Sequence, residues 1–411
     1  MLLNYIWIAF LLVAFVVALV ELLFTGSGAA FGAMTEALFA QAKTGFELSL
    51  GLAGILTLWQ GLLNVGEKSG LVGRFARVTA PFFGVLFPSI PKGHPVLGTM
   101  VMNFSANLLG LDNAATPLGL QAMQDLQKLN VRKEEASDAM IMFLCINASG
   151  LTVIPITIIM YRLQLGSASP SDVFLPILLA TGASTLAAIF MVAFRQRLNL
   201  FRLPFLLPLL VLIGLVALGF WGVQSVSQER LTEISGTVSH VALLGMVALL
   251  AGSGLFARRN VYEDFIEGAK EGFGTAVKII PYLVAILVAV GVFRASGALD
   301  WLTRGISYGV ETVAGLDASW VDALPTMLMK PLSGSGARGL MIEAMETFGP
   351  DSFVGRLVCL VQGSSDTTFY IVSLYYGSVA IRRIRYTLGV SLLADLVGMA
   401  ASVSLCYFFY A

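Results

Sequence analysis

The stretch TMVMNFSANLLGLDNAATPLG (residues 99–119) begins as an apolar helix and turns polar in the middle of a region long enough to cross a bilayer. A second stretch, TMLMKPLSGSGARG (residues 326–339), begins in the same way 227 residues later. Gly and Pro loosen a helix, while Asn and Ser offer its freed backbone groups other hydrogen-bond partners. We therefore predict a broken or re-entrant helical segment in each half of the chain.

Two further matches follow in the same order and indicate an internal repeat. QAMQ (residues 121–124) corresponds to EAME (343–346), and INASGLT (146–152) corresponds to VQGSSDT (361–367). Each match alone is weak because Met and Ala are common in apolar chains, but their order and the similar hydropathy around them favour a repeat. The separation falls from 227 to 222 to 215 residues, which small deletions explain.

The composition places the chain in a membrane. It is 57% hydrophobic and 12% charged, with a mean hydropathy of +0.84, so it has too little polar surface to cover a soluble globule of 411 residues. A span needs about 20 apolar residues. Suitable windows lie at 4–24, 45–65, 139–161, 172–194, 203–222, 237–256, 278–295, 353–377 and 386–410, and two broken regions lie at 94–128 and 320–348. Residues 2–20 lack a basic flank, so we predict a retained span there and not a cleaved signal peptide.

Lys and Arg gather in alternate loops. The loops near 125–138, 195–202, 257–270 and 382–385 hold three each, whereas those near 25–43, 162–172, 223–236 and 345–352 hold three between them. Basic residues stay on the cytoplasmic side, so we predict that the N-terminus lies inside and the C-terminus outside. Segment 139–161 then runs outward and its partner 353–377 inward, which gives the two copies inverted topology.

The predicted fold class is an all-α, polytopic integral membrane protein with two inverted-topology repeats. An N-terminal span and its outside loop (1–43) come first, followed by the first repeat (44–195). A linking transmembrane hairpin (196–270) leads to the second repeat (271–411).

The interrupted segments carry polar residues that we expect to bind a solute or ion. In the first copy these are Asn103, Ser105, Asn107, Asp112, Asn113, Thr116, Asn147 and Ser149. In the second copy they are Lys330, Ser333, Ser335, Arg338, Gln362, Ser364, Ser365, Asp366 and Thr367.

Two interpretations of these residues stay open. Small residues also permit close helix packing, amides also bond between helices, and an Asp/Lys or Asp/Arg pair also serves structure alone. A lone charge in a bilayer costs about 3 kcal/mol, so these side chains pair with one another or face water or ligand. The sharper hypothesis is that Lys330 and Arg338 meet an anionic group while Asp112 or Asp366 binds a coupling cation, sodium or a proton.

Other classes of function find little support. The formal net charge is zero and no basic cluster is interleaved with aromatic residues, so nucleic acid is not an expected partner. We expect no enzyme, because the chain has no GxSxG elbow and neither histidine lies in the repeat-matched polar segments. It has no HExxH and no CxxC spacing among its three cysteines, so we expect no metal and no cofactor beyond a coupling ion.

The same segments resemble a known family. NFSANLLGLDNAATPLGLQAMQDLQ and INASGLTVIP are similar to spore maturation protein A, whereas KPLSGSGARGLMIEAMETFGPDSF and VQGSSDTTFYIVSLYYGSV are similar to spore maturation protein B. Both belong to a group that shares the nucleoside-recognition or Gate domain. This resemblance implies a fusion of the two and a permease-like core with re-entrant hairpins, and it does not fix a substrate.

We therefore expect a multi-pass protein of the cytoplasmic membrane that moves a small polar or anionic solute, coupled to an ion. The alternative is a non-transporting membrane scaffold that supports envelope or spore maturation. The expected partners are the solute and the lipid bilayer, and assembly into a homo-oligomer is left open.

The predicted orientation has a direct test. Single cysteines introduced into the loops 125–138 and 345–352 should react with a membrane-impermeant thiol reagent from opposite sides of the membrane, because inversion places them on opposite faces. Labelling from the same side would mean that the repeats are not inverted.

Overall fold

The chain is α-helical in the computed structural model, which describes residues 2–91, 94–108, 112–150, 155–211, 214, 228–314 and 317–410. Within these residues, five helices are long and apolar enough to cross a membrane. They cover Tyr5–Thr25, Ala29–Lys68, Phe174–Gln196, Val261–Ala295 and Thr387–Tyr410. Each overlaps a predicted window, which confirms the all-helical membrane class.

The exposed side chains of these helices are largely apolar. On α1 (Leu2–Thr25), Leu12 and Phe24 are 60% and 86% exposed, and α17 (Thr387–Tyr410) exposes Leu393 and Leu396 in the same way. Soluble proteins rarely leave such extended apolar faces in water. The faces are therefore suited to contact with lipid chains.

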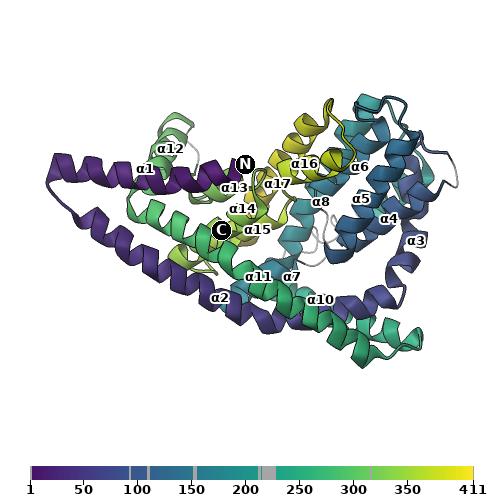
Figure 1. Cartoon of the computed structure of the whole chain (residues 1–411), viewed down its shortest axis with the longest axis horizontal. Helices are drawn as coiled ribbons and strands as arrows, with labels where there is room; N and C mark the ends of the chain where they lie inside the picture. The colour runs from purple at the N-terminus through teal and green to yellow at the C-terminus, as the bar shows by residue number, and fades with distance from the viewer. Residues whose placement is uncertain are drawn as a thin grey trace. The chain divides into compact units, whose positions relative to one another are not determined.

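The helices can be set out as two series of similar order and length, one for each predicted copy; Figure 1 labels them. The first series is α2 (Ala29–Lys68), α3 (Leu71–Leu86), α4 (Pro95–Leu108), α5 (Asp112–Leu129), α6 (Asp138–Ala148), α7 (Ile156–Gln164) and α8 (Phe174–Gln196). The second is α11 (Val261–Ala295), α12 (Ala298–Ala314), the 3-10 turn η1 (Val321–Ala323) with α13 (Leu324–Met329), α14 (Gly334–Phe348), α15 (Phe353–Gly363), α16 (Thr368–Ser378) and α17. Outside both series lie α1 and α10 (Gln228–Phe256).

The ends of α2 and α11 are alike in detail. Gly70 and Gly297 follow these helices with φ of 75° and 76°, in the left-handed region that favours glycine. The serine before each glycine, Ser69 or Ser296, bonds through its hydroxyl to the carbonyl three residues earlier, at 2.7 and 2.8 Å. The two glycines stand 227 positions apart, as Thr99 and Thr326 do. This Ser-Gly match is too short to be recognised from the sequence alone.

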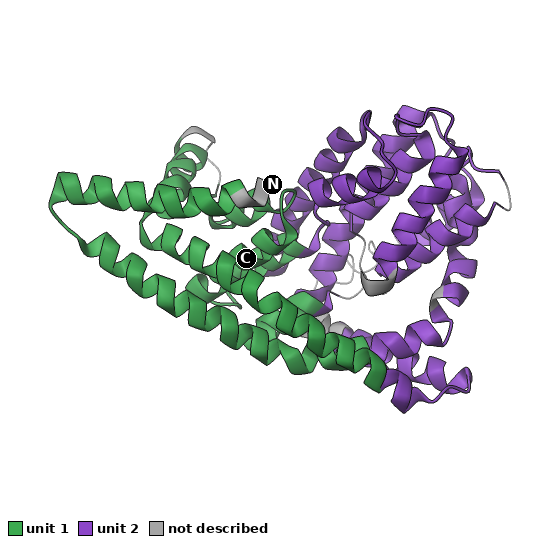
Figure 2. Cartoon of the chain, in the orientation of Figure 1, with its two compact units in different colours: residues 1–61, 157–170, 266–362 green, residues 62–156, 171–265, 363–411 purple. Residues whose placement is uncertain are grey.

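Each of the two compact units takes segments from both copies (Figure 2). Unit 1 comprises residues 1–61, 157–170 and 266–362, and unit 2 comprises 62–156, 171–265 and 363–411. Helix α7 of the first copy therefore belongs to unit 1, while its counterpart α16 belongs to unit 2. The compact units thus do not coincide with the predicted repeats.

In unit 1, the counterpart helices α2 and α11 pack antiparallel and very closely. A Cβ on Gly45 would lie 3.0 Å from Cα of Val284, and a Cβ on Gly272 would lie 2.5 Å from the carbonyl oxygen of Leu56. Gly45 and Gly272 also stand 227 positions apart. Each helix therefore presents an equivalent glycine to the backbone of the other.

In unit 2, the counterpart helices α8 and α17 also run antiparallel. Gln196 at the end of α8 donates to the Tyr386 hydroxyl just before α17, at 3.0 Å. The Tyr410 hydroxyl at the end of α17 donates to the Asp172 carbonyl just before α8, at 3.1 Å. The two helices are thus tied at both ends.

A buried arginine holds the end of α7 in unit 1. Arg162 is fully buried and donates to Asp351 Oδ1 at 2.9 Å and to Pro350 O at 2.6 Å, both in the loop between α14 and α15. Asp351 also accepts from Ser167 Oγ and Ala168 N. Partial burial would raise the pKa of Asp351, but these hydrogen bonds and the Arg162 charge hold the pKa below its usual range.

The corresponding loops of unit 2 also meet. The backbone N–H groups of Arg382 and Arg383, which follow α16, donate to Glu134 O in the loop between α5 and α6, at 3.0 and 2.9 Å. Ala136 N returns a bond of 3.0 Å to Arg383 O. Arg382 pairs with Glu134 at 3.8 Å, and both side chains are well exposed. Arg385 pairs with Glu135 and Asp138 in the same contact, and none of these side chains is fully buried. The same loops are thus joined in both units, but only unit 1 uses a buried charge.

The structure corrects three expectations. The windows 139–161 and 353–377 are not continuous spans, because α6 ends at Ala148 before α7 begins, and α15 ends at Gly363 before α16 begins. Residues 29–43 belong to α2 and not to an outside loop. Residues 212–213 and 215–222 of the window 203–222 and the centre of the first break, residues 109–111, lie outside the described residues.

Gly272→Ala should destabilise the protein by about 1–3 kcal/mol, because the new Cβ meets the Leu56 carbonyl and forces α2 and α11 apart. Gly274→Ala is the matched control. Its Cβ would meet nothing within 4 Å, so it should be neutral or gain up to about 1 kcal/mol of helix propensity. Thermal unfolding in detergent checks both, and equal melting temperatures would contradict the close packing.

Asp351→Asn should destabilise the protein by about 1–3 kcal/mol at pH 7, since it leaves the buried Arg162 without its carboxylate. A lowered native pKa contributes stability above the unfolded value and loses it as the pH falls through the native value. The difference between wild type and variant should therefore begin to shrink below about pH 4, the ordinary value of an Asp carboxyl, and vanish only below the lowered native pKa.

Glu134→Gln is the control for this charge effect, because its exposed ion pair with Arg382 should contribute under about 1 kcal/mol. Melting curves between pH 3 and pH 8 measure both variants. An Asp351→Asn deficit that stays constant over this range would contradict the role given to the charge.

Candidate functional site

Two interrupted helices meet in unit 2, and their backbones touch. The Asp366 N–H, in the break between α15 and α16, donates to Ala148 O at the end of α6, at 2.8 Å. Gly150 follows with φ of 63°, and a Cβ there would lie 2.6 Å from the Asp366 nitrogen. Glycine is thus required at this position both for its conformation and for the close approach.

Hydroxyl groups satisfy the other carbonyls that α6 frees where it ends. Ser149 Oγ lies 2.7 Å from Ile146 O and 2.9 Å from Thr185 Oγ1 of α8. Thr181 Oγ1, one turn earlier on α8, lies 3.2 Å from Ser149 O and 3.1 Å from Gly150 O. A helix end inside a bilayer has no water to bond, so these side chains make the break stable.

The start of α16 presents polar groups at the same contact. Asp366 is exposed, and its Oδ1 accepts from the Thr367 N–H at 2.6 Å, next to the positive end of the helix dipole. Ser365 is buried, and its hydroxyl has no hydrogen-bond partner among the described residues. Buried polar groups are nearly always bonded, so the Ser365 hydroxyl marks a place for a polar ligand group or a water molecule.

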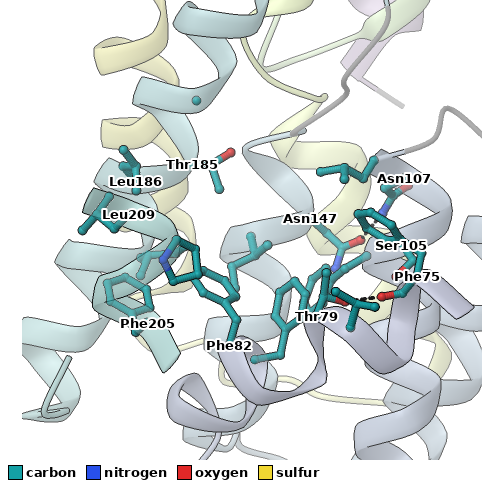
Figure 3. A pocket seen from close by; sticks show the side chains of 18 of the residues that line it. Phe75, Thr79, Phe82, Ser105, Asn107, Asn147, Thr185, Leu186, Phe205 and Leu209 are labelled. Atoms are coloured by element: carbon teal, nitrogen blue, oxygen red, sulfur yellow. Dashed lines mark hydrogen bonds between the residues drawn. The ribbon is translucent and has the colours of Figure 1, made fainter. Parts of the chain in front are cut away.

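A hydrogen bond between two side-chain amides, called the amide bridge below, joins the first hairpin, α4–α5, to α6. Asn107 on α4 donates from Nδ2 to Asn147 Oδ1 at 2.8 Å, and Asn147 in turn donates to Phe143 O at 2.8 Å (Figure 3). Ser105, two residues earlier on α4, donates to Val101 O of the same helix at 2.7 Å. These bonds set the position of α4 beside the break.

The amide bridge lies at the edge of a cavity of about 440 Å³ in unit 2 (Figure 3). Polar groups come from Ser105, Asn107, Asn147 and Thr185, and no charged side chain lies in the described lining. Thr79 adds a further hydroxyl. The remaining walls are apolar, with five aromatic side chains, Phe75, Phe82, Phe83, Phe104 and Phe205, among aliphatic ones such as Val78, Ile146 and Leu209. Such a lining suits an uncharged group that offers one or two hydrogen bonds.

Asn103 is the most deeply buried of the predicted residues in the first hairpin. It is fully buried, and its Nδ2 donates to Ala115 O on α5 at 2.7 Å, which holds α4 against α5. Tyr375 of α16 places its hydroxyl over Gly119, inside the contact distance of any Cβ there, and that Cβ would also lie 3.0 Å from Asn103 Nδ2. Asn103 therefore holds α4 against α5, and its buried Oδ1 has no hydrogen-bond partner among the described residues, as is also true of the Ser365 hydroxyl.

The second hairpin, α13–α14, lies in unit 1 and offers a helix N-terminus. Ser333 caps α14 by accepting from Gly336 N at 3.0 Å, and its hydroxyl lies 3.3 Å from the exposed Ser335 hydroxyl. Lys330 is buried just before this cap, and Arg338 is half-buried one turn into α14. Positive charge beside a helix N-terminus favours an anion.

The predicted residues are thus divided between two units. Unit 2 brings together Asn107 with Asn147, and Ser149 with the segment that holds Ser364, Ser365, Asp366 and Thr367. Unit 1 holds Lys330, Ser333, Ser335, Arg338 and Gln362, whose buried Oε1 has no hydrogen-bond partner among the described residues. Thr116 is exposed on α5, and the side chains of Asp112 and Asn113 lie outside the description.

The aromatic wall of the cavity was not predicted. Phe75, Phe82 and Phe83 occupy positions that recur on one face of α3, which is a helical pattern that can be read from the sequence. In a chain where every helix has an apolar face, that pattern alone does not separate a cavity wall from a lipid-facing surface.

Gly119→Ala should destabilise the protein by about 1–3 kcal/mol, because the added methyl group overlaps the Tyr375 hydroxyl. Tyr375→Phe removes that hydroxyl but leaves the ring carbon Cζ, which lies 2.6 Å from the added methyl group, so the double variant should recover only part of the loss. Gly98→Ala on α4 is the control, since its Cβ would meet nothing within 4 Å. Thermal unfolding measures all four, and strict additivity of the two changes would contradict the contact.

Comparison with known proteins places this site in a family. Residues 49–164 match the Gate model, described as nucleoside recognition. Spore maturation protein A of Bacillus subtilis (strain 168) is 40% identical over 186 residues, which cover 45% of this chain and 91% of that protein.

Spore maturation protein B of the same strain is 43% identical over 171 residues, which cover 42% of this chain and 94% of that protein. Two relatives, each matched over almost its whole length, thus correspond to separate halves of one chain. The chain belongs to the family of spore maturation proteins A and B, with a Gate, or nucleoside-recognition, domain at residues 49–164, and its halves are homologous to the two proteins, consistent with a fusion of them.

Proposed function

We propose that the protein is a transporter that moves a small polar or anionic solute across the cytoplasmic membrane. The observation that carries this proposal is the contact of the two helix breaks, where Gly150 approaches Asp366 and the buried Ser365 hydroxyl has no hydrogen-bond partner in the described part of the chain. Interrupted helices that meet within a membrane domain free backbone and side-chain groups for a solute. A domain with a purely structural role has no need of an unpaired buried hydroxyl at this point.

We also propose that the two copies have inverted topology, with the N-terminus inside and the C-terminus outside. The antiparallel packing of α2 with α11, and of α8 with α17, supports this arrangement, because each pair consists of counterparts in the repeat. The exchange of α7 and α16 between the units supports it as well. Two related halves of this kind can alternate in opening a central site to either side of the membrane.

The two units suit different chemical groups of the proposed solute. In unit 2 the uncharged, aromatic cavity with its Asn107–Asn147 bridge suits a polar, uncharged group. In unit 1 the capped N-terminus of α14, with Lys330 and Arg338 beside it, suits an anionic group. We propose Asp366, exposed at the contact of the breaks, as the carboxylate that responds to a coupling ion, sodium or a proton.

One finding favours a second function. Both curated relatives are named for spore maturation and not for a cargo. A membrane scaffold that supports envelope or spore maturation would use the same helices and would need no solute. The two functions differ in one consequence, because substitutions at the breaks of a scaffold should affect folding and not flux.

Asp366→Asn and Arg338→Gln should leave membrane insertion intact and abolish flux, because each removes a charge from a proposed binding position. A thermal-shift screen of the purified protein against nucleosides, dicarboxylates, divalent metals and sodium would first identify the cargo class. Uptake of that cargo into proteoliposomes then measures flux.

Arg304→Gln, at an exposed position of α12, is the control and should transport normally. Wild-type uptake in both Asp366→Asn and Arg338→Gln would exclude these residues from the site. Failure of all cargo classes to shift the melting temperature would favour the scaffold.

A further inference from the structure

A group of charged residues in unit 1 lies outside the proposed solute site. Arg294, in the last turn of α11, interacts with carboxylates from three other elements, by ion pairs with two of them and by charge alone with Asp322. They are Asp300 of α12, Asp322 of η1 and Glu343 of α14. One guanidinium group thus faces several acids, and Glu346, one turn beyond Glu343 on the same helix, adds another.

Glu343 takes up most of the bonding capacity of Arg294. Glu343 is buried, and its Oε2 accepts from Arg294 at 2.9 Å, while its Oε1 accepts from Thr347 at 3.1 Å. The Arg294 Nε also contacts this carboxylate. Asp300 is 3.8 Å from Arg294 and is half-exposed. The positive charge of Arg294 is therefore balanced by Glu343. Glu346 has the Glu343 carboxylate as a neighbour and no cationic partner of its own among the described residues.

The partner of Glu346 is an amide held in a fixed position. Gln41 of α2 donates from Nε2 to Glu346 Oε2 at 3.4 Å. Gly291 of α11 makes room for it, because a Cβ there would lie 2.5 Å from Gln41 Cγ. The Gln41 Oε1 is buried and has no donor among the described residues.

This unpaired oxygen points to a proton. An amide that donates to one carboxyl oxygen can accept from the other only if that carboxyl carries hydrogen, and the two groups then form a pair of hydrogen bonds. A proton on Glu346 would supply the missing donor for Gln41 and remove the repulsion from Glu343. We propose that Glu346 is a proton-binding site that holds a proton at neutral pH, paired with Gln41.

Comparison of the two copies supports this assignment. The match of QAMQ to EAME places Gln121 and Gln124 of α5 where α14 has Glu343 and Glu346. The same fold position is therefore occupied by an amide in one copy and by an ionisable carboxyl in the other. A proton bound at Glu346 would make the two side chains alike in charge and in hydrogen bonding, and its release would make the copies differ.

The binding of the proton is independent of transport, whereas a role for it in coupling rests on the proposed function. Infrared spectroscopy separates the two, because a protonated carboxyl has a C=O stretching band distinct from that of a carboxylate. In purified wild-type protein at pH 7, we expect one such band that Glu346→Gln removes. Glutamine can donate to Gln41 as the protonated acid does, so this variant should keep the wild-type melting temperature.

Glu36→Gln, at an exposed position of the same helix as Gln41, is the matched control and should leave the band unchanged. Gln41→Leu should weaken proton binding and shift the loss of the band to lower pH. A folded Glu346→Gln protein with an unchanged band would overturn the site. If the band is lost as expected but wild-type flux is insensitive to a proton gradient, the coupling role fails and the binding site stands.

Discussion

The absence of water inside a bilayer is the constraint on which this structure depends. A helix that stops at membrane depth must find partners for its last carbonyls and for the first N–H groups of the next segment. Here two such stops supply partners for each other, because Ala148 O accepts from Asp366 N and the Thr181 hydroxyl covers the two carbonyls that follow. Each break is stable because the other lies against it.

The same contact explains why both helices are interrupted at corresponding places. Gly150 permits the backbones to touch, and any side chain there would separate them. Beyond the breaks, α7 and α16 enter units that are otherwise built largely from the other copy, so each needs a fastening of its own. Arg162 and Asp351 provide one in unit 1, and the backbone bonds of Glu134 to Arg382 and Arg383 provide the other in unit 2. A buried guanidinium group must have all its donors paired, whereas backbone hydrogen bonds at an exposed loop do not depend on a particular side chain. Substitution of Arg162 or Asp351 should therefore cost more stability than substitution of Glu134.

Hydropathy and repeat matching predicted the membrane class and the five long helices, because burial in lipid demands continuous apolar runs. They did not predict the breaks within 139–161 and 353–377, where two short apolar helices and a small polar gap average to one apparent span. Gly150 and Pro155 are signals for the first break and the polar run at residues 364–368 is a signal for the second, but each is also compatible with a kink. The pairing of Asn107 with Asn147 was foreseeable only as polarity at matched depth, since which amide meets which depends on how the hairpin packs. The aromatic cavity depends on segments far apart in the chain, and no local pattern identifies it.

The two copies share a framework and differ in charge, and that difference bears on how the protein could work. Apart from Asp112, the first copy places neutral amides and hydroxyls at the matched polar positions, as in Asn107, Asn147 and Gln124. The second copy places Lys330, Arg338, Glu346 and Asp366 at or near the corresponding places. Charge inside a membrane is tolerated only where it is paired, hydrated or neutralised by protons. The stability of the charged copy therefore depends on the protons and ions that it binds. The neutral copy holds a preformed cavity with no charged side chain in its described lining, so the stability of that cavity does not depend on bound ions. In the proposed transporter, the neutral copy can thus hold an uncharged part of the solute, while the charged copy meets its anionic group and responds to a coupling ion.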